Sequence, residues 1–208
     1  VIGASGRVGN ILAEKLLNEG HTVIGTSRRT EKLFNSASYL QLNFDLLENI
    51  DVLESKFPND LDAVYFVSGS RGKNLLQLDL DGAIKAMKVT EKKKVFRFIM
   101  LSSIFSLEPE RWENEGLNSL RDYYVAKHYA DLWLINNTDL NYTILQPGAL
   151  VEAEGSGKIQ VNVDRHGENS IENVAEVLLE ILNQPTTVNK IISMHDGNTP
   201  IKQALIVL

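Results

Sequence analysis

Cysteine is absent from this sequence of 208 residues, and histidine is scarce. Without cysteine the chain can form no disulfide, no thiolate nucleophile and no cysteine-bound zinc site. The four histidines are His21, His128, His166 and His195. They are scattered along the chain, with no His-x-x-x-His pair that would place two metal ligands on one helical face, so we expect no metal.

Long apolar runs and an excess of basic residues are also missing. No apolar run approaches the roughly 18 residues of a membrane span, and a net charge of −6 offers no electrostatic footprint for nucleic acid. The sequence has no Gly-x-Ser-x-Gly elbow, which disfavours a hydrolase. No secretory leader is visible either. We therefore expect a cytoplasmic protein that acts on a small molecule, folded as one domain over residues 1–208.

A glycine-rich stretch at the start of the chain is the strongest single motif. Apolar residues lead into Gly3, Gly6 and Gly9, and an amphipathic run follows at once. This is the strand, turn and helix order of a dinucleotide-binding loop, in which the helix amino terminus faces phosphate. The first gap is one residue longer than in Gly-x-Gly-x-x-Gly, and an ordinary strand-to-helix connection is the alternative. The residues expected to bind a cofactor here are Gly3, Ser5, Gly6, Arg7 and Val8.

Arginines follow the next predicted strand, which spans residues 21–26. Arg28 stands nineteen positions after Gly9. An acidic residue in this region would bind the ribose 2′-hydroxyl of NAD(H), whereas arginine accommodates the 2′-phosphate of NADP(H). No acid occupies the strand end, so the sequence favours NADP(H) over NAD(H), with Arg28 and Arg29 at the 2′-phosphate and Arg7 as a further cation. A solvated arginine pair is the alternative.

Predicted strands and helices alternate along the rest of the chain. Further strands are expected at 39–44, 63–67, 95–101, 141–146 and 190–194, and helices at 7–19, 47–56, 74–91, 120–136, 170–183 and 199–205. This alternation predicts an α/β fold, doubly wound around a mostly parallel sheet with helices on both faces. Ligands of such folds bind outside the carboxyl ends of the strands.

Several predicted strand ends carry residues suited to a ligand. Asp45 can accept a hydrogen bond from an adenine amino group, with Leu46 against the ring, or it can simply cap the next helix. The other expected cofactor contacts at strand ends are Val67, Ser68, Gly69, Pro147 and Gly148. Segments 105–119 and 150–169 are expected to cover the substrate, and most of the second, from Glu152 to Asn169, is expected to be a mobile flap.

The order of the motifs resembles that of the atypical short-chain dehydrogenase/reductases. The matching motifs are Gly-Ala-Ser-Gly-Arg-Val-Gly at 3–9, Met-Leu-Ser-Ser at 100–103, Tyr-Tyr-Val-Ala-Lys at 123–127 and Leu-Asn-Tyr-Thr-Ile-Leu-Gln-Pro-Gly-Ala-Leu at 140–150. Within that group the chain is similar to the NAD(P)H-binding members, which include biliverdin reductase B-like proteins and many small bacterial proteins. The resemblance covers nearly the whole chain.

The resemblance implies specific catalytic roles. A serine at a strand end would hold the substrate carbonyl, a tyrosine would give it a proton as hydride arrives from the nicotinamide, and a lysine would bind the ribose and favour the tyrosine anion. Carried over by position, these roles fall to Ser103, or its neighbour Ser102, and to Tyr123 and Lys127. Pro147 and Gly148 would lie beside the nicotinamide.

These features predict an oxidoreductase that uses NADP(H) to reduce a small carbonyl, quinone or flavin-like acceptor. Tyr123 and Lys127 stand four residues apart, so a helix projects both from one face, although Tyr124 offers a competing hydroxyl. A non-catalytic regulator that senses NADP(H) is a second hypothesis. A sugar-nucleotide epimerase-like enzyme is less favoured, because 208 residues leave little room for a C-terminal substrate domain.

Overall fold

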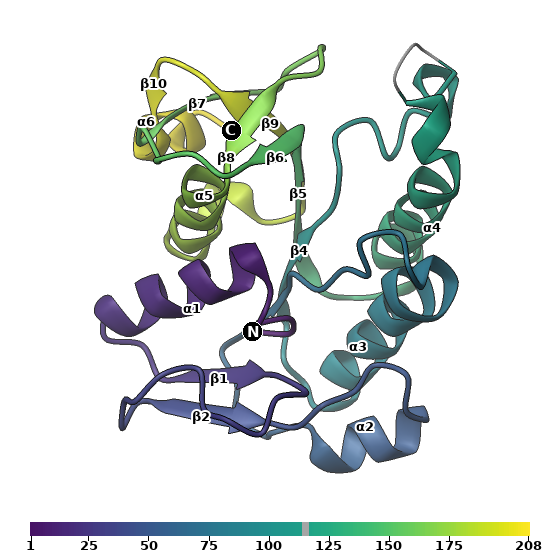
Figure 1. Ribbon diagram of the computed structural model, residues 1–208, viewed down its shortest axis with the longest axis vertical. Helices are drawn as coiled ribbons and strands as arrows, with labels where there is room; N and C mark the ends of the chain where they lie inside the picture. The colour runs from purple at the N-terminus through teal and green to yellow at the C-terminus, as the bar shows by residue number, and fades with distance from the viewer. Residues whose placement is uncertain (114–116) are drawn as a thin grey trace.

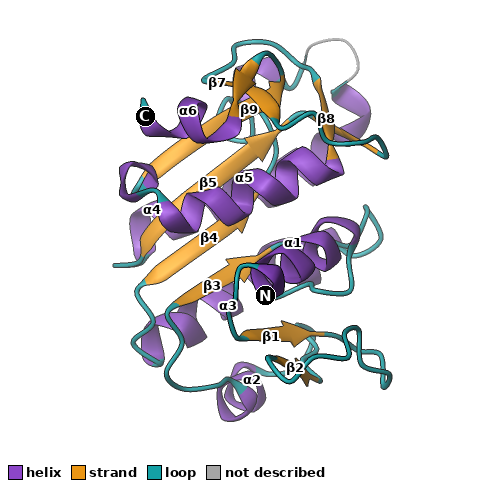
Figure 2. Cartoon of the chain, turned by 90° about the vertical axis from the view of Figure 1, so that its left-hand side faces the viewer, coloured by secondary structure: helices purple, strands orange, loops and turns teal. Residues whose placement is uncertain are grey.

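The structure is a computed structural model that describes residues 1–113 and 117–208. Its main sheet is built from β3 (Ala63–Phe66), β4 (Arg97–Leu101), β5 (Asn141–Pro147), β7 (Lys158–Val161), β9 (Lys190–Asp196) and β10 (Thr199–Pro200). The spatial order is β10-β7-β9-β5-β4-β3. Strands β3, β4, β5 and β9 pair in parallel, and β7 and β10 add an antiparallel edge (Figure 2).

The first residues of the chain join this sheet to a smaller one. Strands β1 (Val23–Thr26) and β2 (Tyr39–Leu42) pair in parallel. The Ile2 N–H donates to the Tyr65 carbonyl at 2.8 Å, and the Thr26 N–H donates to the Val1 carbonyl at 2.9 Å. Residues 1–2 therefore lie between β1 and β3 and lead directly into the glycine loop. The expected doubly wound, mostly parallel α/β fold is confirmed.

Helices cover both faces of the sheet (Figure 1). On one face lie α1 (Arg7–Asn18) and α5 (Ile171–Asn183), and on the other lie α2 (Ile50–Lys56), α3 (Asp81–Lys92) and α4 (Arg121–Asn137), while α6 (Ile201–Ile206) lies near β10. Side chains alternate across each strand. In β4, Ile99 joins the core under α1 and α5, and its neighbours Phe98 and Met100 join the core under α3 and α4.

The predicted element boundaries agree with the structure to within three residues, with two exceptions. The first is the expected helix over 74–91, which begins as a π-helical turn, η1 (Leu75–Leu80), before α3. The second is the segment 152–169, which was expected to be a mobile flap but forms strands in the structure. It contains β7 and leads into β8 (Glu168–Ser170), which pairs with β6 (Ala149–Val151). Its strand residue Ile159 is fully buried, so burial and strand pairing fix this segment.

The other expected covering segment, 105–119, folds over a small apolar cluster. It contains the 3₁₀ turn η2 (Pro109–Arg111) and leads into η3 (Asn118–Leu120). Ile104, Phe105, Trp112, Leu117 and Tyr124 pack together beneath it. Residues 114–116 of this prediction lie outside the described residues.

A search of the described residues finds no helix with the length and apolar character needed to cross a membrane. It also finds no group of three or more His, Asp and Glu side chains placed to hold a metal ion.

Candidate functional site

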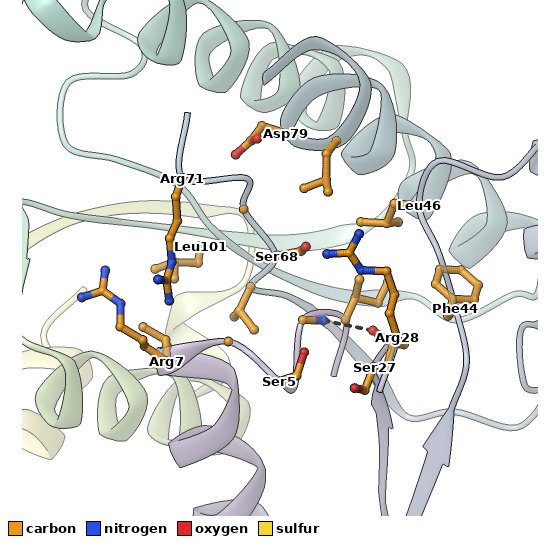
Figure 3. A pocket seen from close by; sticks show the side chains of 18 of the residues that line it. Ser5, Arg7, Ser27, Arg28, Phe44, Leu46, Ser68, Arg71, Asp79 and Leu101 are labelled. Carbon is orange, nitrogen blue, oxygen red and sulfur yellow. Dashed lines mark hydrogen bonds between the residues drawn. The ribbon is translucent and has the colours of Figure 1, made fainter. Parts of the chain in front are cut away.

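A cavity of about 470 Å³ opens at the carboxyl ends of β1, β3 and β4 (Figure 3). The sequence predicted many of its lining residues: Gly3, Ser5, Gly6, Arg7, Val8, Arg28, Asp45, Leu46, Val67, Ser68, Gly69, Tyr123 and Lys127. Positions that are up to 124 apart in the chain, from Gly3 to Lys127, are thus brought to one place. The predicted residues that do not line the cavity are Arg29, Ser103, Pro147 and Gly148.

The glycine loop is shaped by steric limits on its backbone. Gly3 has a φ of +96°, and a Cβ atom there would lie 2.8 Å from the Ser68 backbone. At Gly9 a Cβ atom would lie 2.2 Å from the Gly3 carbonyl oxygen. The Thr26 hydroxyl accepts a hydrogen bond from the Gly3 N–H at 3.1 Å, which ties the loop to β1. The loop thus forms a cradle that side chains would fill, beside the amino terminus of α1.

Guanidinium groups reach this cavity from two sides. Arg28 follows the end of β1, and in Figure 3 its guanidinium lies between Ser68 and Leu46. Arg7 and Arg71 lie on the other side of Ser68. Arg7 pairs with Glu152, with 3.0 Å between Nη1 and Oε1. The local charge is therefore positive, which suits a ligand that carries phosphates.

Arg29 does not line this cavity, and its expected contact with a 2′-phosphate stays a prediction. Its backbone is used to shape the turn after β1: the N–H donates to the Ser27 hydroxyl at 3.0 Å, and the carbonyl accepts from Gln41 Nε2 at 2.8 Å. Its side chain is exposed outside the cavity. Of the two arginines, Arg28 lines the cavity and Arg29 does not.

Tyr123 and Lys127 lie together at the inner end of the cavity, as the spacing on α4 predicts. The Lys127 side chain is buried, and its Nζ donates to the Leu101 carbonyl at 3.2 Å. The same Nζ lies 5.8 Å from the centre of the Tyr123 ring. This geometry places a cation next to a phenol in a partly enclosed site.

Both serines after β4 were expected candidates, and in the structure Ser102 lines the cavity and Ser103 does not. Ser103 is engaged by Tyr124. Burial raises the pKa of Tyr124, and the hydrogen bond with Ser103 opposes that rise. Ser103 and Tyr124 are thus hydrogen-bonded to each other. Tyr124 does not line the cavity, so its hydroxyl does not compete with that of Tyr123 there.

Ser102 is tied to a buried carboxylate that sequence reasoning missed. Its hydroxyl donates to Asp131 Oδ2 at 2.6 Å, and the Ser106 hydroxyl donates to the same oxygen at 2.5 Å. Asp131 is fully buried. Burial raises its pKa, while the hydrogen bonds from Ser102 and Ser106 and the charge of Lys127 oppose the rise. The available signal was its position four residues after Lys127, on the same face of α4.

Pro147 and Gly148 do not line the cavity and lie against neighbouring strands and backbone instead. Pro147 pairs with Met194 in the β5–β9 register. A Cβ atom at Gly148 would lie 2.1 Å from the Gly167 carbonyl oxygen. The absence of a side chain at Gly148 therefore allows the chain leaving β5 to pass close to the start of β8. Their expected contacts with a nicotinamide are not part of the cavity lining.

The cavity also has lining residues that were not predicted. They are Ile2, Thr26, Ser27, Phe44, Arg71, Leu78, Asp79 and Leu101, whereas the lining residues Ser102 and Leu150 belong to the expected serine pair and the expected covering segment. Asp79 is almost fully buried in η1, and its carboxylate oxygens accept from the Ser70 N–H at 3.0 and 3.3 Å. A signal existed in the small residues Ser68–Gly72 after β3, which predict room for a ligand but do not identify the side chains that reach it.

The glycine loop, the doubly wound sheet and the cavity at its carboxyl edge define a Rossmann-type nucleotide-binding fold. A family model described as NAD(P)H-binding matches residues 3–185. The chain therefore belongs to this NAD(P)H-binding family, which confirms the resemblance found in the sequence motifs.

Relatives extend over nearly the full length of the chain. UPF0659 protein YMR090W of Saccharomyces cerevisiae is 34% identical over 98% of this chain and 95% of its own length. YhfK of Bacillus subtilis, whose name describes it as an uncharacterized sugar epimerase, is 33% identical over 99% of this chain and 97% of its own length.

Solved structures agree with this placement. The oxidoreductase ylbE of Lactococcus lactis has a TM-score of 0.95 and 42% identity, covering 100% of this chain and 94% of that one. A short-chain dehydrogenase/reductase of Veillonella parvula, solved in complex with NADP, has a TM-score of 0.74, with coverage of 96% and 94%. At 17% identity the latter shares the fold.

Proposed function

We propose that the protein is an NADP(H)-dependent oxidoreductase that reduces a small carbonyl, quinone or flavin-like acceptor by hydride transfer. The observation that carries this proposal is the shared cavity, in which the glycine loop and Arg28 lie at one side and Tyr123 and Lys127 at the other. One side offers a phosphate cradle and the other a proton donor beside a cation.

The residues present fit a dinucleotide phosphate. The glycine cradle and the first turn of α1 would hold the bridging phosphates. Arg28 would hold the 2′-phosphate, because a guanidinium offers forked donors and no acid stands at this strand end. Asp45 and Leu46 would contact the adenine, and Lys127 would bind a ribose hydroxyl.

The bound nicotinamide would supply the hydride, and the chain would supply proton transfer and orientation. Tyr123 would donate its phenolic proton to the acceptor oxygen, and the neighbouring Lys127 cation would stabilise the anion that remains. Ser102 commits its proton to Asp131 and so presents lone pairs to the cavity. A substrate carbonyl would therefore receive its hydrogen bond from Tyr123 and not from the serine.

The hydrogen bonds of Ser102 and Ser103 favour a second candidate function. Ser102 is hydrogen-bonded to Asp131 and Ser103 to Tyr124. Neither serine is therefore free to donate a hydrogen bond to a substrate carbonyl, as the serine of the short-chain reductases does. A protein that binds NADP(H) as a sensor, without turnover, would need no such serine.

Parallel titrations with NADPH and NADH, followed by nicotinamide fluorescence, test the cofactor proposal. NADPH is expected to bind at least about tenfold more tightly, which corresponds to about 1.4 kcal/mol. Oxidation of NADPH is then measured with quinone, flavin and carbonyl acceptors. Binding without turnover on any of these acceptors would favour the sensor, and binding of neither nucleotide would contradict both proposals.

A further inference from the structure

We propose that Arg71 is a second anion-binding residue of this site, which covers the bridging phosphates of the dinucleotide from the side opposite the glycine loop. The inference rests on the proposed binding of a dinucleotide. Nothing in the motif pattern of the chain assigns a role to Arg71, which stands in the loop after β3.

The position of Arg71 brings its charge to the right part of the cavity. Arg71 lines the cavity, and Figure 3 shows its side chain extending towards Arg7 and Leu101. Arg7 is the first residue of α1 and marks the amino terminus of that helix. The guanidinium of Arg71 and the N–H groups of the first turn of α1 therefore approach one space from opposite sides. An anion that accepts from the helix terminus is within the reach expected for Arg71.

The charge of Arg71 is uncommitted. Among residues 1–113 and 117–208, no carboxylate forms an ion pair with its guanidinium. By contrast, Arg7 is already paired with Glu152. The bridging phosphates carry two negative charges, and the cradle supplies mainly neutral N–H donors, so an uncommitted guanidinium complements them.

The loop that carries Arg71 is held in an unusual conformation. Arg71 has a φ of +53°, in the left-handed region that residues other than glycine rarely adopt. The preceding Ser70 N–H is bound by the buried carboxylate of Asp79, and the Lys73 N–H closes the turn by donating to the Ser70 carbonyl at 3.2 Å. The anchor at Asp79 fixes where the loop leaves the sheet and so fixes the base of the Arg71 side chain.

The 2′-phosphate is not the group that Arg71 meets. Arg28 extends into the cavity from the end of β1, across from Arg71 (Figure 3). The 2′-phosphate is present only in NADP(H), whereas the bridging phosphates are common to NADP(H) and NAD(H). The two arginines are therefore distinguished by which nucleotide responds to their removal.

The experiment compares Arg71→Ala with Arg28→Ala and with Lys73→Ala, an exposed cation on the same turn. The Kd values for NADPH and NADH are measured by fluorescence titration. Arg71→Ala is expected to weaken both about tenfold and to leave their ratio unchanged. Arg28→Ala is expected to weaken NADPH selectively. Lys73→Ala is expected to stay within about twofold of the wild type, as for a solvated charge.

Each other outcome overturns the assignment in an identifiable way. Unchanged Kd values in Arg71→Ala, with the wild type binding normally, would show that Arg71 does not touch the nucleotide. A loss confined to NADPH would place it at the 2′-phosphate, and a changed KM for the acceptor alone would place it at the substrate. Failure of the wild type to bind either nucleotide would contradict the proposed function itself.

Discussion

The two sides of the cavity are built on opposite principles. At the phosphate side, Arg7, Arg28 and Arg71 are exposed, Arg7 in the first turn of α1 and the other two on loops. At the inner side, Lys127 and Asp131 are buried on one helix, with 4% and 0% of their surface accessible. Exposed cations attract anions and adapt to them but are screened by salt, whereas buried groups are fixed by hydrogen bonds that are costly to break. Under the proposed function, the mouth of the cavity would determine affinity for the cofactor and the inner side would carry out the chemistry.

The largest expected effect comes from disturbing the cradle between these two sides. Gly3→Ala would place a Cβ atom 2.8 Å from the Ser68 backbone in a residue with φ of +96°. Because neither backbone segment can withdraw freely, we expect a loss of about 3 kcal/mol in the free energy of unfolding. Urea unfolding measures it. The matched control is Gly157→Ala, where φ is +69° but open space surrounds the site, with an expected cost of about 1 kcal/mol. Equal losses in the two variants would contradict the steric explanation.

Tyr123→Phe tests whether the inner side performs chemistry. Removing the proton donor is expected to lower kcat by about 100-fold while the Kd for NADPH stays near the wild-type value. Steady-state rates with an accepted quinone or carbonyl, together with fluorescence titration, measure the two quantities. Tyr124→Phe is the control, because Tyr124 is bound to Ser103 outside the cavity. If Tyr124→Phe lost turnover and Tyr123→Phe did not, the assignment of the donor would be wrong.

Asp131→Asn probes the buried anion through pH. Burial raises the pKa of Asp131 above its usual value of 3.8, so between these two values the folded state binds a proton that the unfolded state has released. The contribution of Asp131 to stability is therefore largest at low pH and falls as pH rises through its folded pKa. The unfolding free energy of the wild type minus that of Asp131→Asn is expected to decrease as pH rises from about 4. The exposed Asp122→Asn on the same helix should show no such slope. A flat or rising difference for Asp131→Asn would show that its charge is not disfavoured by burial.

Glu152→Gln has the smallest expected effect and concerns the mouth alone. The Arg7–Glu152 pair is largely exposed, with 42% and 70% of the side chains accessible, and such pairs are worth under about 1 kcal/mol. Releasing Arg7 is expected to tighten NADPH binding by about twofold, and the gain should vanish at high salt. Glu154→Gln, an exposed neighbour, controls for the change in net charge. Weaker binding in Glu152→Gln would mean that the ion pair holds Arg7 in place for the ligand.

Local chemistry explains which parts of the site could be predicted from the sequence. Gly3, Gly6 and Arg28 belong to short motifs in which conformation and spacing carry the information. Asp131 and Arg71 could not be identified in this way, because their roles depend on contacts with other elements. The choice between Ser102 and Ser103 depended on how the chain leaves β4, where a shift of one residue reverses the direction of a side chain.

The expected flap failed for a related reason. Its polar residues and glycines are typical of a loop, but Ile159 finds a buried position and β7 pairs with β9. Such pairing with a strand formed more than thirty residues later is not visible in local composition.

The segment of residues 149–170, which follows β5, tolerates changes of length at some positions and not at others. Its strands are tied to the main sheet through β7 and to each other through β6 and β8, so length changes within them would shift a register and turn core side chains towards solvent. Variation can be accommodated most readily in the exposed stretch of Asp164, Arg165 and His166 between β7 and β8. In chimaeras made with relatives, residues 149–170 should therefore be exchanged as one unit. Substitutions and changes of length should be confined to residues 164–166.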